Sequence, residues 1–139
     1  MSEDEWRRFL HEPVRPATIA TTRADGRPHV APVWYDVDDD GTIVFTTGAD
    51  TVKGRNVRRD GRVALCVQDD QPPFSFVVVE GAAAVSSDPG ELRTWAARLG
   101  ARYMGPERAD EYGARNGVPG EVLVRVTPGQ VVSAVDLAD

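Results

Sequence analysis

The sequence predicts a mainly β protein, a six-stranded antiparallel barrel with peripheral helices at its rim. Three features support this fold class: six stretches rich in β-branched and aromatic residues, two Asp-Gly pairs among the first three of them, and one long helical stretch before the last. A chain of 139 residues has the size of one domain, and no linker rich in Gly, Ser or Pro divides it. We therefore expect a single domain over residues 1–139.

A short amphipathic helix is expected over residues 3–11, because Trp6, Phe9 and Leu10 follow the spacing i, i+3 and i+4. Three strands are expected after it, over residues 17–22, 29–37 and 42–47.

Two Asp-Gly pairs, Asp25-Gly26 and Asp40-Gly41, separate these three strands. Asp-Gly supplies the positive φ that two-residue hairpin loops need, so both connections are expected to be tight hairpins. Pro32 lies inside the second strand and has no amide hydrogen to donate, which predicts an edge position or a bulge there.

The middle of the chain predicts a short helix and then two strands. Asp50 is expected to cap a helix over residues 51–58, and Asp60-Gly61 forms the turn after it. Gly81 indicates a bulge or a close backbone approach within the second of these strands. The two strands are expected over residues 62–68 and 74–87.

The main helix is expected over residues 88–103, with Asp88 as N-cap, Pro89 at the first helical position and Glu91 completing a capping box. A short helix and a last strand that is broken at Pro128-Gly129 follow it, over residues 106–115 and 121–135. The apolar stripe of the main helix has the spacing i, i+3, i+4, i+7 and consists of Leu92, Trp95, Ala96 and Leu99.

The chain is acidic, with 22 Asp and Glu against 16 Lys and Arg and a formal net charge of −6. This charge argues against a nucleic acid partner, because polyanion binding draws on summed positive charge. No apolar stretch approaches the roughly 20 residues of a membrane span, and the acidic N-terminus lacks the features of a secretion signal. Cys66 is the only cysteine, which suits a reducing compartment, so we expect a cytoplasmic protein with no membrane partner.

Most catalytic constellations have no support in this sequence. His11 and His29 are the only histidines and stand at no metal-ligand spacing, so no metal site is expected. No serine lies in a Gly-x-Ser-x-Gly context, and neither a Walker A nor a Gly-x-Gly-x-x-Gly pattern is present. Cys66 lies in an apolar strand, where a core role is expected, and the sequence names no catalytic side chain.

One stretch departs from the acidic background: five of the 16 basic residues fall between Lys53 and Arg62, and Lys53 is the only lysine. Thr46 and Thr47 end a strand just before a helix begins, and hydroxyls beside exposed helix amides form an anion site. Lys53 falls in the first helical turn, where the macrodipole disfavours a cation unless a phosphate binds there. Two interpretations stay open: a phosphate site at Lys53, or an ion pair of Lys53 with Asp50 beside a solvated arginine face.

Two aromatic pairs are candidates for contacts outside the core. Trp34 and Tyr35 are neighbours on one strand and point to opposite faces, so only one of them can lie in the core. The other faces solvent, a ligand or another subunit. Phe74 and Phe76 share one face of a later strand, where they are either packing residues or a wall against a planar ligand.

The ordered motifs of the chain resemble a known family. Between about Thr18 and Val85 the chain carries, in order, Pro-x-x-x-Pro-Val-Trp-Tyr, Ile-Val-Phe-Thr-Thr, Lys-x-x-Asn-Val-Arg-Arg-Asp-Gly-Arg-Val and Glu-Gly-Ala-Ala. This order resembles the pyridoxamine-phosphate-oxidase-like flavin-binding split barrels, and most of all the actinobacterial branch that binds the deazaflavin coenzyme F420. The resemblance implies a six-stranded antiparallel Greek-key split β-barrel.

The resemblance also implies a homodimer with two cofactor sites at the subunit interface. The cofactor phosphate would lie between a strand end and a helix lysine, and the ring would lie along a neighbouring strand. Carried onto this chain, the phosphate contacts are Thr46, Thr47, Val52 and Lys53, the ring contacts are Pro32, Val33 and Trp34, and the residue contributed across the interface is Phe74.

The activity implied is hydride transfer from reduced coenzyme F420 to a small unsaturated organic substrate. Vitamin B6 oxidation is not implied, because pyridoxamine-phosphate oxidases usually carry an arginine where this chain has Val52. The alternatives are an FMN-binding oxidoreductase of the same fold, a cofactor-binding or storage dimer without turnover, and a small barrel interaction module. The sequence leaves open whether the arginines after Lys53 meet the anionic tail of the coenzyme or face water; these are Arg55, Arg58, Arg59 and Arg62.

Overall fold

Seven antiparallel strands form one sheet in the computed structural model, which describes residues 1–139. The strands are β1 (Ala17–Thr22), β2 (Pro28–Val33), β3 (Asp36–Val37), β4 (Ile43–Gly48), β5 (Arg62–Asp69), β6 (Ser75–Ser86) and β7 (Glu121–Ala134). Their order across the sheet is β2-β1-β5-β6-β7-β4-β3.

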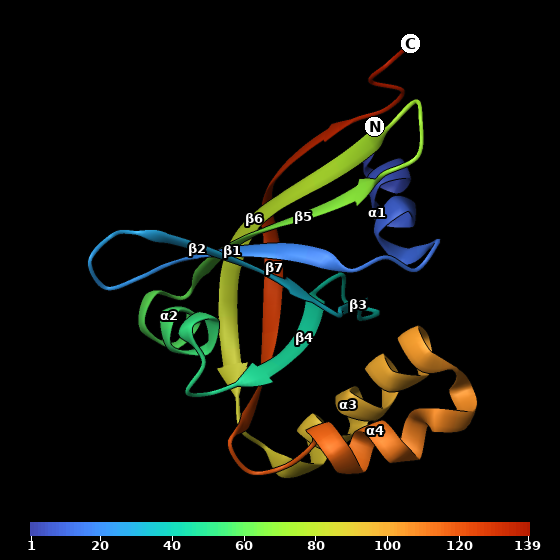
Figure 1. Ribbon diagram of the computed structural model, residues 1–139. Helices are drawn as coiled ribbons and strands as arrows, with labels where there is room; N and C mark the ends of the chain where they lie inside the picture. Colours follow the sequence, from blue (N-terminus) through green and yellow to red (C-terminus); the bar gives the residue numbers. More distant parts are fainter.

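The sheet curls into a barrel because its two edges are tied together by a very short link. β2 and β3 lie at opposite edges, yet only Trp34 and Tyr35 separate them in the chain. Two residues span less than about 10 Å, so the edges must come close to each other (Figure 1). The single strand expected over residues 29–37 is therefore divided in two, which gives seven strands instead of six. Pro32 lies in the edge strand β2, as predicted.

Four α-helices lie around this sheet: α1 (Glu3–His11), α2 (Val52–Asp60), α3 (Pro89–Met104) and α4 (Ala109–Asn116). Figure 1 shows α2 beside the β1–β2 hairpin, α3 and α4 as a pair, and α1 near the ends of β5 and β6 where both chain termini lie. A short 3-10 helix, Pro106–Arg108, joins α3 to α4. None of these helices is both long and apolar enough to cross a membrane.

The main core fills the inside of the curled sheet, and a smaller one lies beneath α3. Phe45 and Val124 alternate along their strands with Val44 and Leu123, so one pair faces the inside and the other faces out. Leu92 and Trp95 of α3, two residues of the predicted stripe, cover the outer pair. β4 and β7 are thus buried on both faces, and α3 is fixed against them.

Two helix caps differ from the expected ones. Thr51, and not Asp50, is the N-cap of α2, and its hydroxyl accepts a hydrogen bond from the Gly54 amide over 3.1 Å. Asp88 caps α3 as predicted, but Glu91 closes no capping box. Its carboxylate instead accepts a hydrogen bond from Nη2 of Arg125 on β7 over 2.9 Å. This contact joins α3 to the sheet, and the sequence around Glu91 does not predict it because Arg125 lies far away in the chain.

The hairpin turns also differ in detail from the expected ones. Each Asp-Gly connection is a three-residue loop in which only the glycine takes positive φ, 89° at Gly26 and 87° at Gly41. The bulge predicted at Gly81 is confirmed, since the β6–β7 register shifts between Glu80 and Gly81. β7 runs through Pro128-Gly129 without the expected break, because the bulge absorbs the extra residue.

Gly100 controls how closely α3 and α4 approach. A Cβ atom on Gly100 would lie 2.3 Å from Cβ of Tyr112, whereas a Cβ on Gly90 of the same helix would lie no nearer than 3.5 Å to another group. We expect Gly100→Ala to lower the free energy of unfolding by about 1–3 kcal/mol, as overpacking does, and Gly90→Ala to leave it unchanged or slightly higher. Urea denaturation of both variants measures this, and equal stability of the two would contradict the close helix contact.

Candidate functional site

A cleft forms where the end of β2, the end of β4 and the start of α2 meet beneath α3 and α4. Its volume is about 200 Å³. Five of the eight residues predicted to bind a cofactor line it, although they come from three separate elements. The lining consists of Pro32, Val33, Trp34, Thr46, Lys53, Ala96, Leu99 and Asn116.

The start of α2 is held tightly against the end of β4. The Thr51 hydroxyl donates to the Gly48 carbonyl oxygen over 2.7 Å while it caps the Gly54 amide. A Cβ atom on Gly54 would lie 2.1 Å from that same carbonyl oxygen, so only glycine permits this approach. The helix start, and with it Lys53, therefore has a fixed position relative to β4.

Lys53 has no partner within the chain. Its ammonium group forms neither an ion pair nor a hydrogen bond, and the ion pair with Asp50 that the sequence left open is absent. The amide of Lys53 also lacks an acceptor. A cation in the first turn of a helix that pairs with no carboxylate suits an anionic ligand.

The two threonines that end β4 have different surroundings, because neighbouring strand residues point to opposite faces. Thr46 lines the cleft, whereas Thr47 is buried. The Thr47 hydroxyl lies 3.2 Å from Oγ1 of Thr51, so Thr47 supports the cap of α2 and does not face the cleft.

An aromatic stack forms one wall of the cleft. The Trp34 ring lies parallel to Tyr103 of α3, with centroids 5.0 Å apart, and meets Tyr112 of α4 edge-on at 5.6 Å. Tyr35 points the other way and is fully buried, which confirms that the two neighbours face opposite sides. A flat ring wall next to an unpaired cation fits a ligand that carries both a planar group and an anion.

Tyr103 fixes the backbone beneath this wall. Its hydroxyl accepts from the Tyr35 amide over 3.1 Å and donates to the carbonyl oxygen of Arg15 over 2.7 Å. Burial raises the pKa of both the Tyr35 and the Tyr103 phenol, so each keeps its proton at neutral pH.

Val52 and Phe74 lie outside the cleft of Lys53. Val52 borders a separate cleft of about 370 Å³ between α2 and the β1–β2 hairpin, with several arginines around it. Phe74 takes positive φ in the loop before β6, so it does not begin that strand as expected. It borders a third cleft of about 420 Å³, together with Cys66, Phe76 and Leu137.

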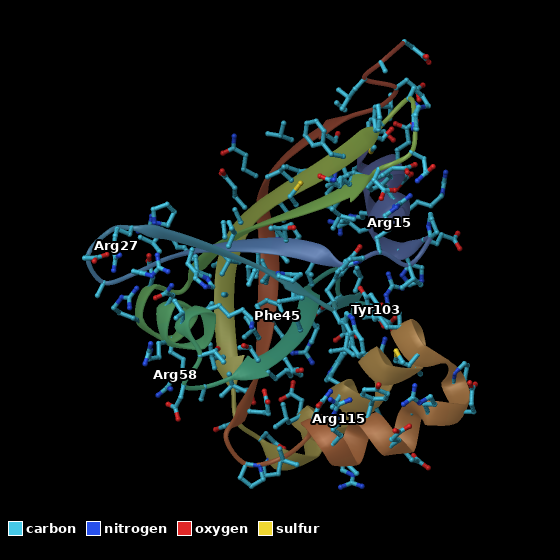
Figure 2. The ribbon with its side chains drawn as sticks, viewed as in Figure 1. Arg15, Arg27, Phe45, Arg58, Tyr103 and Arg115 are labelled. Carbon is cyan, nitrogen blue, oxygen red and sulfur yellow. The ribbon has the colours of Figure 1, made fainter.

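The arginines after Lys53 do not form one uniform surface. Arg58 donates to the carbonyl oxygen of Ala49 over 3.1 Å, and Arg59 binds the carbonyl oxygen of Thr22. Figure 2 shows Arg58 on the outer side of α2. Arg55 is exposed, and it is the arginine of this helix whose side chain makes no hydrogen bond or ion pair within the chain.

Three residues of the cleft were not among the predicted site residues. Ala96 and Leu99 belong to the apolar stripe of α3, which the sequence assigns to packing, and Asn116 is the last residue of α4. An Asn-Gly pair at a helix end is an ordinary C-terminal signal, so nothing local distinguished Asn116. Within the chain, no group of three or more His, Cys, Asp or Glu side chains is placed to hold a metal ion.

Comparison with known sequences gives consistent relatives. The sequence model of the family described as pyridoxamine 5'-phosphate oxidase matches residues 2–133. An F420H(2)-dependent biliverdin reductase of Mycobacterium tuberculosis is 32% identical over 125 residues, covering 88% of this chain and 82% of that protein. A 5a,11a-dehydrotetracycline/5a,11a-dehydrooxytetracycline reductase of Streptomyces rimosus is 30% identical over 122 residues, covering 83% and 70%.

Solved structures agree with these relatives. A conserved hypothetical protein of Mycobacterium tuberculosis superposes with a TM-score of 0.83 at 33% identity, covering 96% of this chain and 84% of that chain. A protein described as an F420 reductase superposes with a TM-score of 0.72 at 27% identity, covering 91% and 94%.

The Thr51 cap is open to a direct test. Thr51→Val keeps the side-chain shape but removes the oxygen that caps α2, so we expect the free energy of unfolding to fall by about 0.5–2 kcal/mol. Thr94→Val on the exposed face of α3, where the hydroxyl bonds only within its own helix, should change it by less than about 0.5 kcal/mol. Urea denaturation compares the two, and an unchanged stability of Thr51→Val would show that the cap does not hold α2.

Proposed function

The chain belongs to the pyridoxamine 5'-phosphate oxidase family of split barrels, as its sequence predicted, and on that premise we propose that it is a reductase that uses reduced coenzyme F420. The reaction proposed is hydride transfer to a small unsaturated organic substrate. The observation that carries the proposal is the cleft in which the unpaired Lys53 and the Thr46 hydroxyl lie beside the Trp34 wall. These groups fit a phosphate joined to a planar ring.

The names of the relatives favour the deazaflavin over FMN. One relative at 32% identity is described as F420H(2)-dependent, and one structure at 27% identity is described as an F420 reductase. FMN also joins a phosphate to a tricyclic ring, so the cleft by itself fits both cofactors. Titration of the protein with each cofactor distinguishes this proposal from the alternative, an FMN-binding oxidoreductase.

The chain would act by binding and orienting the cofactor and by excluding water from the reacting atoms. When bound, the reduced deazaflavin supplies the hydride. Lys53 and Thr46 would hold the phosphate, and the backbone of Pro32 and Val33 with the Trp34 ring would set the orientation of the planar group. No Asp, Glu or His lines the cleft, so one subunit offers no carboxylic acid or imidazole to the reacting atoms there.

We further propose that the active species is a homodimer. The cleft volume of about 200 Å³ falls below the roughly 300–1,000 Å³ of most ligand pockets, so one subunit would supply only part of the site. Phe74 borders a different cleft of the same chain, and it would meet the cofactor only if it came from a second copy.

The outer face of the sheet supports this assembly. Five side chains in register across β2, β1, β5, β6 and β7 form one row without a charged group: Pro32, Thr18, Cys66, Val78 and Val132. Val132 on β7 is 52% exposed, and Val30, two residues before Pro32 on β2, is 64% exposed. An exposed apolar row of this length is typical of a protein interface.

Lys53 provides the main test of the cofactor. Lys53→Gln removes a charge-assisted contact worth about 1.5–3 kcal/mol, so we expect coenzyme F420 to bind roughly 10- to 150-fold more weakly. Arg7→Gln removes one positive charge from α1, outside the cleft, and should leave the affinity unchanged. Fluorescence titration of the purified protein with coenzyme F420 and, in parallel, FMN measures both affinities. Tight binding of FMN alone would contradict the proposed cofactor.

The proposed interface is tested by a charge on the outer row. Val132→Arg would force an unpaired guanidinium into an apolar contact, so we expect a monomer in sedimentation equilibrium and weaker binding of coenzyme F420. Val14→Arg places the same charge on a valine that is 46% exposed but lies off this row, and it should remain dimeric. A Val132→Arg variant that stays dimeric would place the interface elsewhere.

A further inference from the structure

The cleft contains three polar side chains in otherwise apolar surroundings, and none of them has a partner. The Thr46 hydroxyl, the Lys53 ammonium and the Asn116 amide all line it, and none takes part in a hydrogen bond within the chain. The remaining lining is proline, valine, tryptophan, alanine and leucine. A ligand that forms hydrogen bonds with all three of these side chains would bind most favourably.

Asn116 is held in this position by unusually close helix packing. Gly100 of α3 lies against Tyr112, and a Cβ atom on Gly117 would lie 2.7 Å from the Cα of Arg93. Tyr112 in turn meets the Trp34 ring edge-on at 5.6 Å. The end of α4 is therefore fixed both to α3 and to the aromatic wall of the cleft.

The chain after Asn116 is also tied to the start of α2. The carbonyl oxygen of Gly120 accepts a hydrogen bond from the Ala49 amide over 2.8 Å, three residues before α2 begins. Figure 1 shows the end of α4 on the same side of the barrel as the end of β4. Asn116 and Lys53 thus approach one cleft from two helices that are far apart in the sequence.

We propose that Asn116 is a third ligand of the cofactor phosphate and makes the site selective for a phosphorylated cofactor; this rests on the proposed function. All three side chains can donate a hydrogen bond, and no carboxylate lines the cleft to compete for the anion. The phosphate of coenzyme F420 joins the ring side chain to the tail and has two terminal oxygens, and each of these can accept more than one hydrogen bond, so one ammonium, one hydroxyl and one amide can all bind it. A ring edge or a substrate carbonyl would use at most part of this set.

The test compares two ligands that differ in the phosphate. Wild-type protein is titrated with the deazaflavin riboside and with its 5′-phosphate, neither of which carries the tail. We expect Asn116→Ala to weaken binding of the phosphorylated ligand about tenfold, and Asn116→Asp to weaken it further by repulsion, with the riboside affected less than about twofold. Ala114→Asp, on the exposed side of α4, adds the same charge outside the cleft and should change neither affinity.

Each other outcome overturns the proposal. An equal loss for both ligands would place Asn116 at the ring or in folding, and no loss for either would show that Asn116 makes no contact. If wild-type protein binds neither deazaflavin, the proposed function fails, and inorganic phosphate then tests Asn116 alone. Its side-chain amide resonances should shift on titration with phosphate in wild-type protein and not in Lys53→Gln, and unshifted resonances in wild-type protein would refute the phosphate contact.

Discussion

The short link between the two sheet edges determines most of this structure. Trp34 and Tyr35 connect β2 to β3, and the barrel closes because two residues cannot bridge an open sheet. Tyr35 points inward, where its hydroxyl donates to the carbonyl oxygen of Leu10 at the end of α1 over 2.6 Å. Trp34 points outward and stacks on Tyr103 of α3. The same link therefore closes the barrel, attaches two helices and forms the wall of the candidate site.

The opposite wall depends on a second close contact, between α2 and β4. Gly54 allows the helix to approach the Gly48 carbonyl oxygen, and the hydroxyls of the exposed Thr51 and the buried Thr47 complete the contact. Neither wall rests on a flexible loop. A site with its groups preset on strands and helices loses little ordering entropy when a ligand binds, which suits a protein whose chemistry is supplied by a cofactor.

The sequence predicted the local features well and the distant contacts poorly. The positions of Pro32 and Gly81 and the opposite faces of Trp34 and Tyr35 are confirmed, because each follows from backbone chemistry within a few residues. The family resemblance is confirmed as well. Glu91 paired with Arg125 instead of its own helix, and Asn116 reached the cleft of Lys53, because packing across the fold and not local pattern decides such contacts. The roles carried onto the predicted site residues remain predictions.

The unpaired state of Lys53 has an electrostatic meaning in this protein. Acidic residues outnumber basic ones by 22 to 16, so a surface lysine would ordinarily find a carboxylate close by. Arg58 and Arg59 of the same helix are occupied by backbone carbonyl oxygens, while Lys53 faces a cleft that no carboxylate lines. An acidic chain that leaves its only lysine unpaired at a cleft without carboxylates has kept one place where an anion is attracted and competing carboxylates are absent.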